Sequence, residues 1–146
     1  MRHSAIVERP LDPAALLAQV SAPDCGAAVV FVGTVRDMND GRSVQGLEYT
    51  AYGPMAVSEL DAIVTAAGAR LPGSRIACEH RIGALDLGEA SVVIAVAHPH
   101  RGEAFEACRY VIEELKARLP IWKRERYADG DLAWVENATS AAGGAQ

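Results

Sequence analysis

The chain has 146 residues, of which 50% are hydrophobic and 23% are charged, and its formal net charge is −5. A chain of this length can bury a core in one domain, and its negative charge disfavours binding to nucleic acids and to anionic membranes. Its three cysteines are far apart along the chain and odd in number, so we expect neither a disulfide framework nor a CxxC metal pair. Because the sequence shows neither a long apolar run nor a secretory signal, we expect a cytoplasmic protein.

The first third of the chain predicts one helix and two strands. In residues 11–20, Asp12 can cap a helix whose first position is Pro13, where the missing N–H group is not needed. Residues 27–36 form a nearly continuous apolar run, which is typical of a central strand covered on both faces. Residues 43–52 alternate between apolar and polar side chains, and this pattern predicts a half-exposed strand.

The middle of the chain predicts a helix, two strands and a further helix. Residues 54–71 carry apolar side chains at helical spacing. Residues 74–83 alternate and predict a half-exposed strand, whereas residues 90–100 have the apolar run of a central strand. Residues 102–118 again show helical spacing, and Pro120 ends this helix.

A hairpin and a polar tail are predicted at the end of the chain. Strands in "WKRERYA" and "LAWVE" are joined across Asp129 and Gly130, a pair typical of a tight turn. Residues 137–146 are small and polar and are expected to be disordered. We therefore predict an α+β, or mixed α/β, single domain over residues 1–136.

The stretch "LKARLPIWKRE" of this acidic chain concentrates four cations: Lys116, Arg118, Lys123 and Arg124. One interpretation is that all four are solvated at a helix C-terminus, where they complement its partial negative charge. The other is that Pro120 turns the chain so that the amines of Lys116 and Lys123 converge on a cleft. The local sequence leaves both interpretations open.

Cations elsewhere in the chain favour the cleft. In "AHPHRGEAF" a strand gives way to a helix, so His100 and Arg101 lie beside the free N–H groups of a helix N-terminus, which attract anions. Arg36 follows the other apolar strand, ahead of residues 37–42, which we interpret as a mobile loop. Ligands of open α/β sheets gather at strand ends and helix starts. If these segments meet, one pocket for a small anionic ligand is lined by five side chains: Arg36, His100, Arg101, Lys116 and Lys123.

Other reactive side chains have ordinary interpretations. His98 and His100 are two residues apart, but no third ligand lies nearby, so we predict no metal site. Cys25 is the one candidate nucleophile, and it lacks the surrounding cations that would lower the pKa of a thiol. Trp122 and Trp134 are expected to close the core, although both can also border the pocket.

Several segments resemble one known family. "FVGTVRD", "LEYTAY" followed by Met55, "PHRGEAFEACRYVIEELKARLPIWKRE" and "GDLAWVE" are similar to the large, catalytic subunit of molybdopterin synthase, and the likeness extends over residues 27–136. The resemblance implies an α/β hammerhead fold with an added antiparallel β subdomain. His98 departs from the family pattern, since a small polar residue is expected at this position.

The resemblance implies a sulfurtransferase that needs no cofactor. A small ubiquitin-like partner would bring sulfur as a thiocarboxylate on its C-terminal Gly-Gly. The enzyme would place two sulfurs on cyclic pyranopterin monophosphate to form the dithiolene of molybdopterin. The resemblance also implies a homodimer with one small partner per subunit, hence a heterotetramer, and a pocket that can borrow His100 and Arg101 from the second copy.

The family's roles carry over residue by residue. Lys116 resembles the principal catalytic lysine, and Lys123 resembles the second pocket lysine. Arg36, His100 and Arg101 match positions that bind anions. On this assignment Lys116 polarises the thiocarboxylate or transfers protons, Lys123 holds the acyl tail or stabilises developing negative charge, and the other cations hold phosphate and pterin.

Two other functions remain open at the level of the sequence. A non-catalytic binding module for a small phosphorylated metabolite would need Arg36 and Arg101 but not Lys116. A sulfurtransferase that carries its own persulfide would need Cys25. Neither alternative explains why two lysines flank "ARLPIW" so closely.

Overall fold

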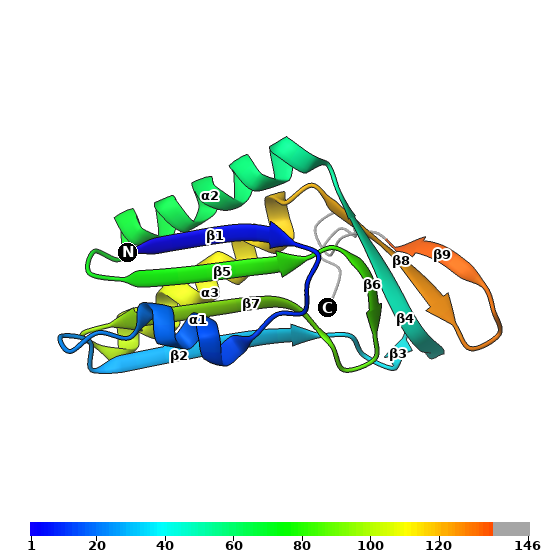
Figure 1. Cartoon of the computed structure of the whole chain (residues 1–146), viewed down its shortest axis with the longest axis horizontal. Coiled ribbons are helices and arrows are strands. Elements are labelled where there is room, and N and C mark those ends of the chain that lie inside the picture. The colour runs from blue at the N-terminus through cyan, green and yellow to red at the C-terminus, as the bar shows by residue number, and fades with distance from the viewer. Residues whose placement is uncertain (136–146) are drawn as a thin grey trace.

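The computed structural model describes residues 1–135 and contains two sheets and three helices (Figure 1). The first sheet has the strand order β1-β5-β7-β2. Its strands are β1 (Arg2–Val7), β2 (Ala27–Thr34), β5 (Arg75–Arg81) and β7 (Ala90–His98). β1 pairs with β5 in parallel, and the other neighbours are antiparallel. The predicted α+β, mixed α/β class is confirmed.

The second sheet is antiparallel and lies at one end of the first (Figure 1). Its strands are β3 (Met38–Asn39), β4 (Arg42–Ala51), β6 (Gly83–Asp86), β8 (Ile121–Tyr127) and β9 (Leu132–Val135). The order is β3-β4-β8-β9, and β6 pairs with β4. The predicted hairpin between β8 and β9 is present, and Gly130 supports its turn with a φ of +86° that L side chains rarely adopt. This sheet corresponds to the expected antiparallel addition.

Helices cover both faces of the first sheet. α1 (Pro13–Val20) packs on one face, and α2 (Gly53–Arg70) and α3 (Arg101–Arg118) pack on the other. As predicted, Asp12 caps α1, since its carboxylate accepts hydrogen bonds from the N–H groups of Ala14 and Ala15 at 3.0 and 3.3 Å. The larger core lies under α2 and α3 and extends through Leu115 and Leu119 to Ile121. Core packing therefore fixes both the end of α3 and the start of β8.

The apolar runs do not both become central strands. β7 is buried along almost its whole length, as predicted. β2 lies at the edge of the sheet, and Phe31 and Val32 are 36% and 38% exposed. The prediction of a covered, central β2 is therefore wrong, because no strand within the described part of the chain pairs with its outer edge. A surface of this kind is typical of a protein contact.

β5 is an interior strand, so the prediction of half exposure is wrong. Two of its polar side chains, Glu79 and His80, are buried and hydrogen-bonded instead of solvated. Glu79 is 2% exposed and accepts hydrogen bonds from His3 at 2.8 Å and Arg9 at 2.9 Å. His80 bonds its own chain at the carbonyl oxygen of Arg81. These two polar positions of the pattern in residues 74–83 are therefore occupied by buried side chains with hydrogen-bond partners inside the protein.

Three short strands are absent from the prediction. β1 is partly polar and is stabilised by pairing with β5. β6 has four residues, and β3 lies in the segment that we interpreted as a mobile loop. That interpretation is corrected by the hairpin of β3 and β4, which turns at Asp40 and Gly41 with φ values of +50° and +78°. The predicted disordered tail, residues 137–146, lies outside the described residues.

None of the helices in residues 1–135 is long and apolar enough to cross a membrane.

The hydrogen bonds of Asp12 at the start of α1 can be tested by mutation. Replacing Asp12 with Ala removes the acceptor for two N–H groups at the start of α1. We expect the free energy of unfolding to fall by about 0.5 to 2 kcal/mol, as measured by urea denaturation.

The matched control for this cap is Asp12→Asn, because an asparagine side chain still accepts these hydrogen bonds. We expect its unfolding curve to overlay that of the unchanged protein. Equal stability of the Ala and Asn variants would contradict the capping role of Asp12.

Candidate functional site

Lys116 and Lys123 are the only two lysines of the chain, and they converge where the two sheets meet. Lys116 lies in the last turn of α3, and Lys123 is the third residue of β8. The chain reverses at Pro120, whose carbonyl oxygen accepts a hydrogen bond from the N–H group of Tyr52 at 3.1 Å. Both lysines are partly buried, and the charge of Lys123 lowers the pKa of Lys116. The predicted convergence is present.

Arg36 joins this pair from the end of β2. The preceding residue, Val35, is 4% exposed and is held on both sides by backbone hydrogen bonds to the Gly88–Glu89 turn. Burial, then the charges of Lys123 and Arg36, lowers the pKa of Lys116. Burial also lowers the pKa of Lys123, where Glu125 acts in the opposite direction and Arg36 adds to the decrease. Three cations therefore share one site, which we call the lysine cleft: Arg36, Lys116 and Lys123.

Glu125 supports the cleft and is missing from the prediction. It follows Lys123 by two residues on β8, so both side chains point to the same face of the strand. The Glu125 carboxylate is 4% exposed and accepts hydrogen bonds from the Asn39 amide at 2.6 Å and the Tyr127 hydroxyl at 2.9 Å. Alternation in "IWKRERY" is the sequence signal that indicates this inward carboxylate.

A neutral imidazole lies close to Lys116. Burial, with the charge of Lys116 acting in the same direction, lowers the pKa of His80 to about 4. Its Nδ1–H group donates to the carbonyl oxygen of Arg81 at 2.8 Å, and this bond fixes the tautomer. The ring packs edge-on against Tyr49, which pairs with Lys123 across the strands. His80 thus adds no positive charge near the cleft at neutral pH.

The arginines of the same stretch have a different role. Arg118 donates to Glu59 at 2.6 Å and to Glu114 at 3.0 Å. Arg124 pairs with Glu48 and lies over the ring of Trp134. The interpretation of solvated charges at a helix end therefore describes Arg118 but not Lys116.

His100 and Arg101 lie at the opposite end of α3 (Figure 1). Both are exposed, and they line a hollow together with Gly26, Pro99 and Gly102. At the rise of an α-helix, His100 is about 24 Å from Lys116 along the axis. Within one chain, the structure therefore brings Arg36, Lys116 and Lys123 together and leaves His100 and Arg101 apart from them.

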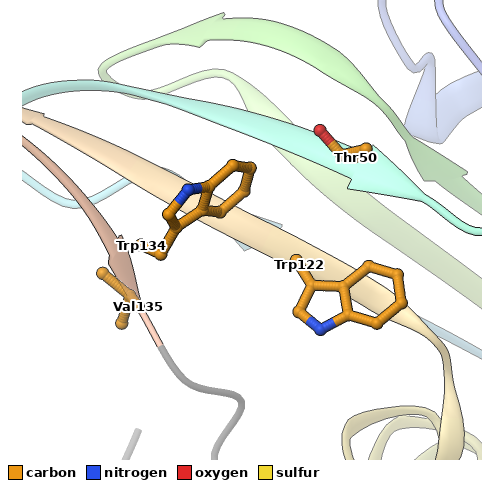
Figure 2. A pocket seen from close by; sticks show the side chains of 4 residues that line it. All are labelled: Thr50, Trp122, Trp134 and Val135. Atoms are coloured by element: carbon orange, nitrogen blue, oxygen red, sulfur yellow. The ribbon is translucent and has the colours of Figure 1, made fainter.

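Trp122 and Trp134 do not close the core, so that prediction is wrong. Their side chains are 48% and 61% exposed, and they line a groove with Thr50 and Val135 (Figure 2). Neighbouring residues of a strand point to opposite faces, so Trp122 lies on the face of β8 away from Lys123. The described part of the chain leaves this outer face uncovered, and the groove is a separate surface from the lysine cleft.

The cysteines and metal ligands of the described residues form no competing site. Burial raises the pKa of the Cys25 thiol, and the neighbouring Asp24 raises it further. Cys78 and Cys108 are buried in the core. Among residues 1–135, no three His, Cys, Asp or Glu side chains are arranged to hold a metal ion.

Known sequences resemble most of this chain. The family model of the MoaE protein matches residues 6–118. The molybdopterin synthase catalytic subunit of Drosophila willistoni is 45% identical over 96% of this chain, which spans only 38% of that sequence. The subunit of Aspergillus clavatus is 42% identical over 92% of the chain and 68% of its own length. The subunit of Halalkalibacterium halodurans is 43% identical over 92% of the chain and 85% of its own length.

Solved structures show the same fold. Molybdopterin synthase from Staphylococcus aureus has a TM-score of 0.85 and 37% identity, and the match covers 90% of this chain and 96% of that one. A complex of subunits 1 and 2 of molybdopterin-converting factor from Helicobacter pylori has a TM-score of 0.74 and 26% identity, and the match covers 91% and 90% of the two chains.

The electrostatic coupling in the lysine cleft can be measured directly. In protein labelled with ¹³C-lysine, Lys123→Met leaves one lysine, and its Cε signal reports the titration of Lys116. We expect the midpoint to rise toward that of an ordinary lysine, because a neighbouring positive charge has been removed. Arg36→Met should raise the midpoints of both lysines.

Arg2→Met is the control for this titration, since Arg2 is an exposed cation at the start of β1. We expect it to leave both lysine midpoints in place. If neither Lys123→Met nor Arg36→Met moves the midpoint of Lys116, the three charges do not share a site.

Proposed function

Because this chain belongs to the MoaE protein family, we propose that it is the catalytic subunit of a molybdopterin synthase, an enzyme of molybdenum cofactor biosynthesis. In this role it is a sulfurtransferase that moves sulfur from the C-terminal thiocarboxylate of a small ubiquitin-like partner to cyclic pyranopterin monophosphate. The product is the dithiolene of molybdopterin. The observation that carries the proposal is the meeting of the chain's two partly buried lysines with the exposed Arg36 at one site.

Both proposed substrates are anions, and the lysine cleft matches their charge. The partner's tail ends in a thiocarboxylate, and the pterin carries a cyclic phosphate. Ammonium and guanidinium groups at a partly buried site interact with such anions more strongly than in bulk water. The chain as a whole is negatively charged, whereas the lysine cleft is positively charged. A small anion can bind the cleft alone, but a nucleic acid would also meet the negative surface around it.

Lys116 is suited to act as the acid and base of the reaction. A lowered pKa increases the fraction of neutral amine at neutral pH, so the group can accept a proton as well as donate one. We assign to Lys116 the polarisation of the thiocarboxylate and the transfer of protons as sulfur attacks. Lys123, whose charge is supported by Glu125, holds the acyl tail or stabilises developing negative charge.

The phosphate and pterin require the remaining cations, and a homodimer supplies them. Arg36 lies in the same cleft as the lysines, but His100 and Arg101 of the same chain are at the far end of α3. A second copy in the opposite orientation brings its own His100 and Arg101 toward the first copy's lysines. One dimer then contains two complete sites.

The edge of the first sheet is the surface that fits this second copy. Phe31 and Val32 on β2 are partly exposed, and Phe105 on α3 is 62% exposed. Phe31, Phe105 and Ile112 line an apolar groove between the strand and the helix. An exposed apolar surface next to an unpaired strand edge favours association with a like surface. Since α3 spans the distance between the two cation clusters, contact along it aligns opposite ends of the two helices.

A small partner completes the assembly. The related Helicobacter pylori structure is a complex of two different subunits, and by analogy we propose one small subunit for each copy of this chain. The Gly-Gly end of its tail has no side chains to grip, so backbone hydrogen bonds and the charge of the lysine cleft must hold it. The complete assembly is a heterotetramer.

Replacing Lys116 with Ala tests the catalytic assignment. We expect product formation from thiocarboxylated partner and cyclic pterin to fall by about 10²-fold or more, as loss of a positioned acid or base usually does. The circular dichroism spectrum should not change. Arg118→Ala is the matched control, because Arg118 is two residues away and pairs with Glu59 and Glu114. Near-normal turnover by Lys116→Ala would refute the assignment.

The same variant separates the enzyme from a binding module for a phosphorylated metabolite. If Lys116 acts in catalysis, calorimetric binding of the cyclic pterin should survive in Lys116→Ala while sulfur transfer is lost. A binding module would retain its full biological activity without Lys116.

Mixing two inactive variants tests the shared site. Lys116→Ala and Arg101→Ala dimers are combined and allowed to exchange subunits. If each site takes Lys116 from one copy and Arg101 from the other, hybrid dimers have one intact site, and about a quarter of the wild-type activity returns. If both residues served a site within one copy, every site would lack one of them, and no activity would return.

A further inference from the structure

His98 uses both of its ring nitrogens inside the protein. It is the last residue of β7 and is 5% exposed. Its Nε2 lies 3.1 Å from the carbonyl oxygen of Pro72, and its Nδ1 lies 2.9 Å from the backbone nitrogen of His100. A carbonyl oxygen only accepts and an N–H group only donates, so Nε2 carries the proton and Nδ1 is the acceptor.

These two bonds link segments that are distant along the chain. Pro72 lies just after α2, whose last helical residue is Arg70. His100 is the N-cap residue of α3, and its side chain makes no capping hydrogen bond. The His98 ring therefore joins the end of one helix to the start of the other.

The turn that carries His100 is also confined from the opposite side. A Cβ atom at Gly26 would lie 2.9 Å from the carbonyl oxygen of Pro99, so the backbone just before β2 approaches this turn closely. At Gly73, a Cβ atom would lie 3.4 Å from Nε2 of His98. The backbone of residues 98–101 thus lies between Gly26 and the Pro72–Gly73 turn. On the side of that turn, the contact is the hydrogen bond from the His98 ring to Pro72.

We propose that His98 is a positioning residue that aims His100 and Arg101 at the substrate phosphate of the second copy's cleft. The proposal rests on the function proposed above, in which those two cations bind the anionic pterin. An acceptor at Nδ1 fixes the N–H group of His100, and with it the direction in which both side chains leave the backbone. A small polar side chain at position 98 could accept that N–H group but could not also reach Pro72.

Two variants divide the roles of the ring. His98→Asn places an amide oxygen near the position of Nδ1, where it can accept from an N–H group two residues later, as in an Asx turn. His98→Gln places its amide near Nε2, where it can donate to Pro72 but is too distant to accept from His100. Both variants remain polar, and their thermal unfolding is compared first to establish that each is folded.

Steady-state kinetics of the assembled complex with thiocarboxylated partner give the main measurement. We expect His98→Gln to raise KM for cyclic pyranopterin monophosphate about two- to tenfold while kcat changes by less than about twofold, because ground-state binding is lost. His98→Asn should keep KM within about twofold of the wild-type value. Equal KM values for the Asn and Gln variants would overturn the proposal.

Amide hydrogen exchange gives a readout that does not depend on activity. The His100 amide should exchange faster in His98→Gln than in the wild-type protein, and not in His98→Asn. Unchanged exchange in His98→Gln would overturn the proposal.

Arg101→Ala separates this proposal from the function on which it rests. If Arg101→Ala weakens calorimetric binding of the cyclic pterin and His98→Gln does not raise KM, only the role of His98 fails. If Arg101→Ala binds the cyclic pterin as tightly as the wild-type protein, the assignment of the anion site fails, and the role of His98 fails with it.

Discussion

The partial burial of two lysines beside a third cation, Arg36, is the constraint on which the candidate site depends. Burial, and then the charges of Lys123 and Arg36, lowers the pKa of Lys116, so both the desolvation of the amine and the repulsion between like charges oppose folding. The opposing stabilisation comes from the core under α2 and α3, which continues through Leu119 and Ile121 on either side of the reversal at Pro120. Hydrophobic packing thus holds the lysine cleft in a charged state that its own electrostatics disfavour.

Local signals predict the helices, and non-local pairing explains the errors in the sheets. Asp12 and Pro120 mark a helix start and a helix end through contacts within a few residues. The order of strands depends on partners far away in the chain, so the apolar run of β2 does not reveal that it lies at an edge. In β5, the local sequence predicts a solvated Glu79, because its hydrogen-bond partners His3 and Arg9 belong to the first segment of the chain.

The same division holds for the site. The approach of Lys123 to Lys116 is predictable because Pro120 reverses the chain between them, whereas Arg36 enters only through the strand-end argument and the family resemblance. Glu125 is absent from the prediction because Arg124 and Arg126 on either side of it are also charged, so charge alone does not distinguish the inward face of β8. The two bonds of His98 could not be predicted, since one of them reaches Pro72, which is separated from it by the whole of β5 and β6.

The length of α3 has a mechanical consequence for the proposed dimer. In that dimer, one helix would carry a lysine of its own cleft at one end and, at the other end, the two side chains proposed to bind the anion of the neighbouring cleft. A helix transmits axial displacement with little compression, because its backbone hydrogen bonds run parallel to the axis. In the proposed dimer, occupation of one cleft that shifted α3 along its axis would therefore also move cations in the opposite cleft. The proposed dimer would thus couple its two sites mechanically through α3.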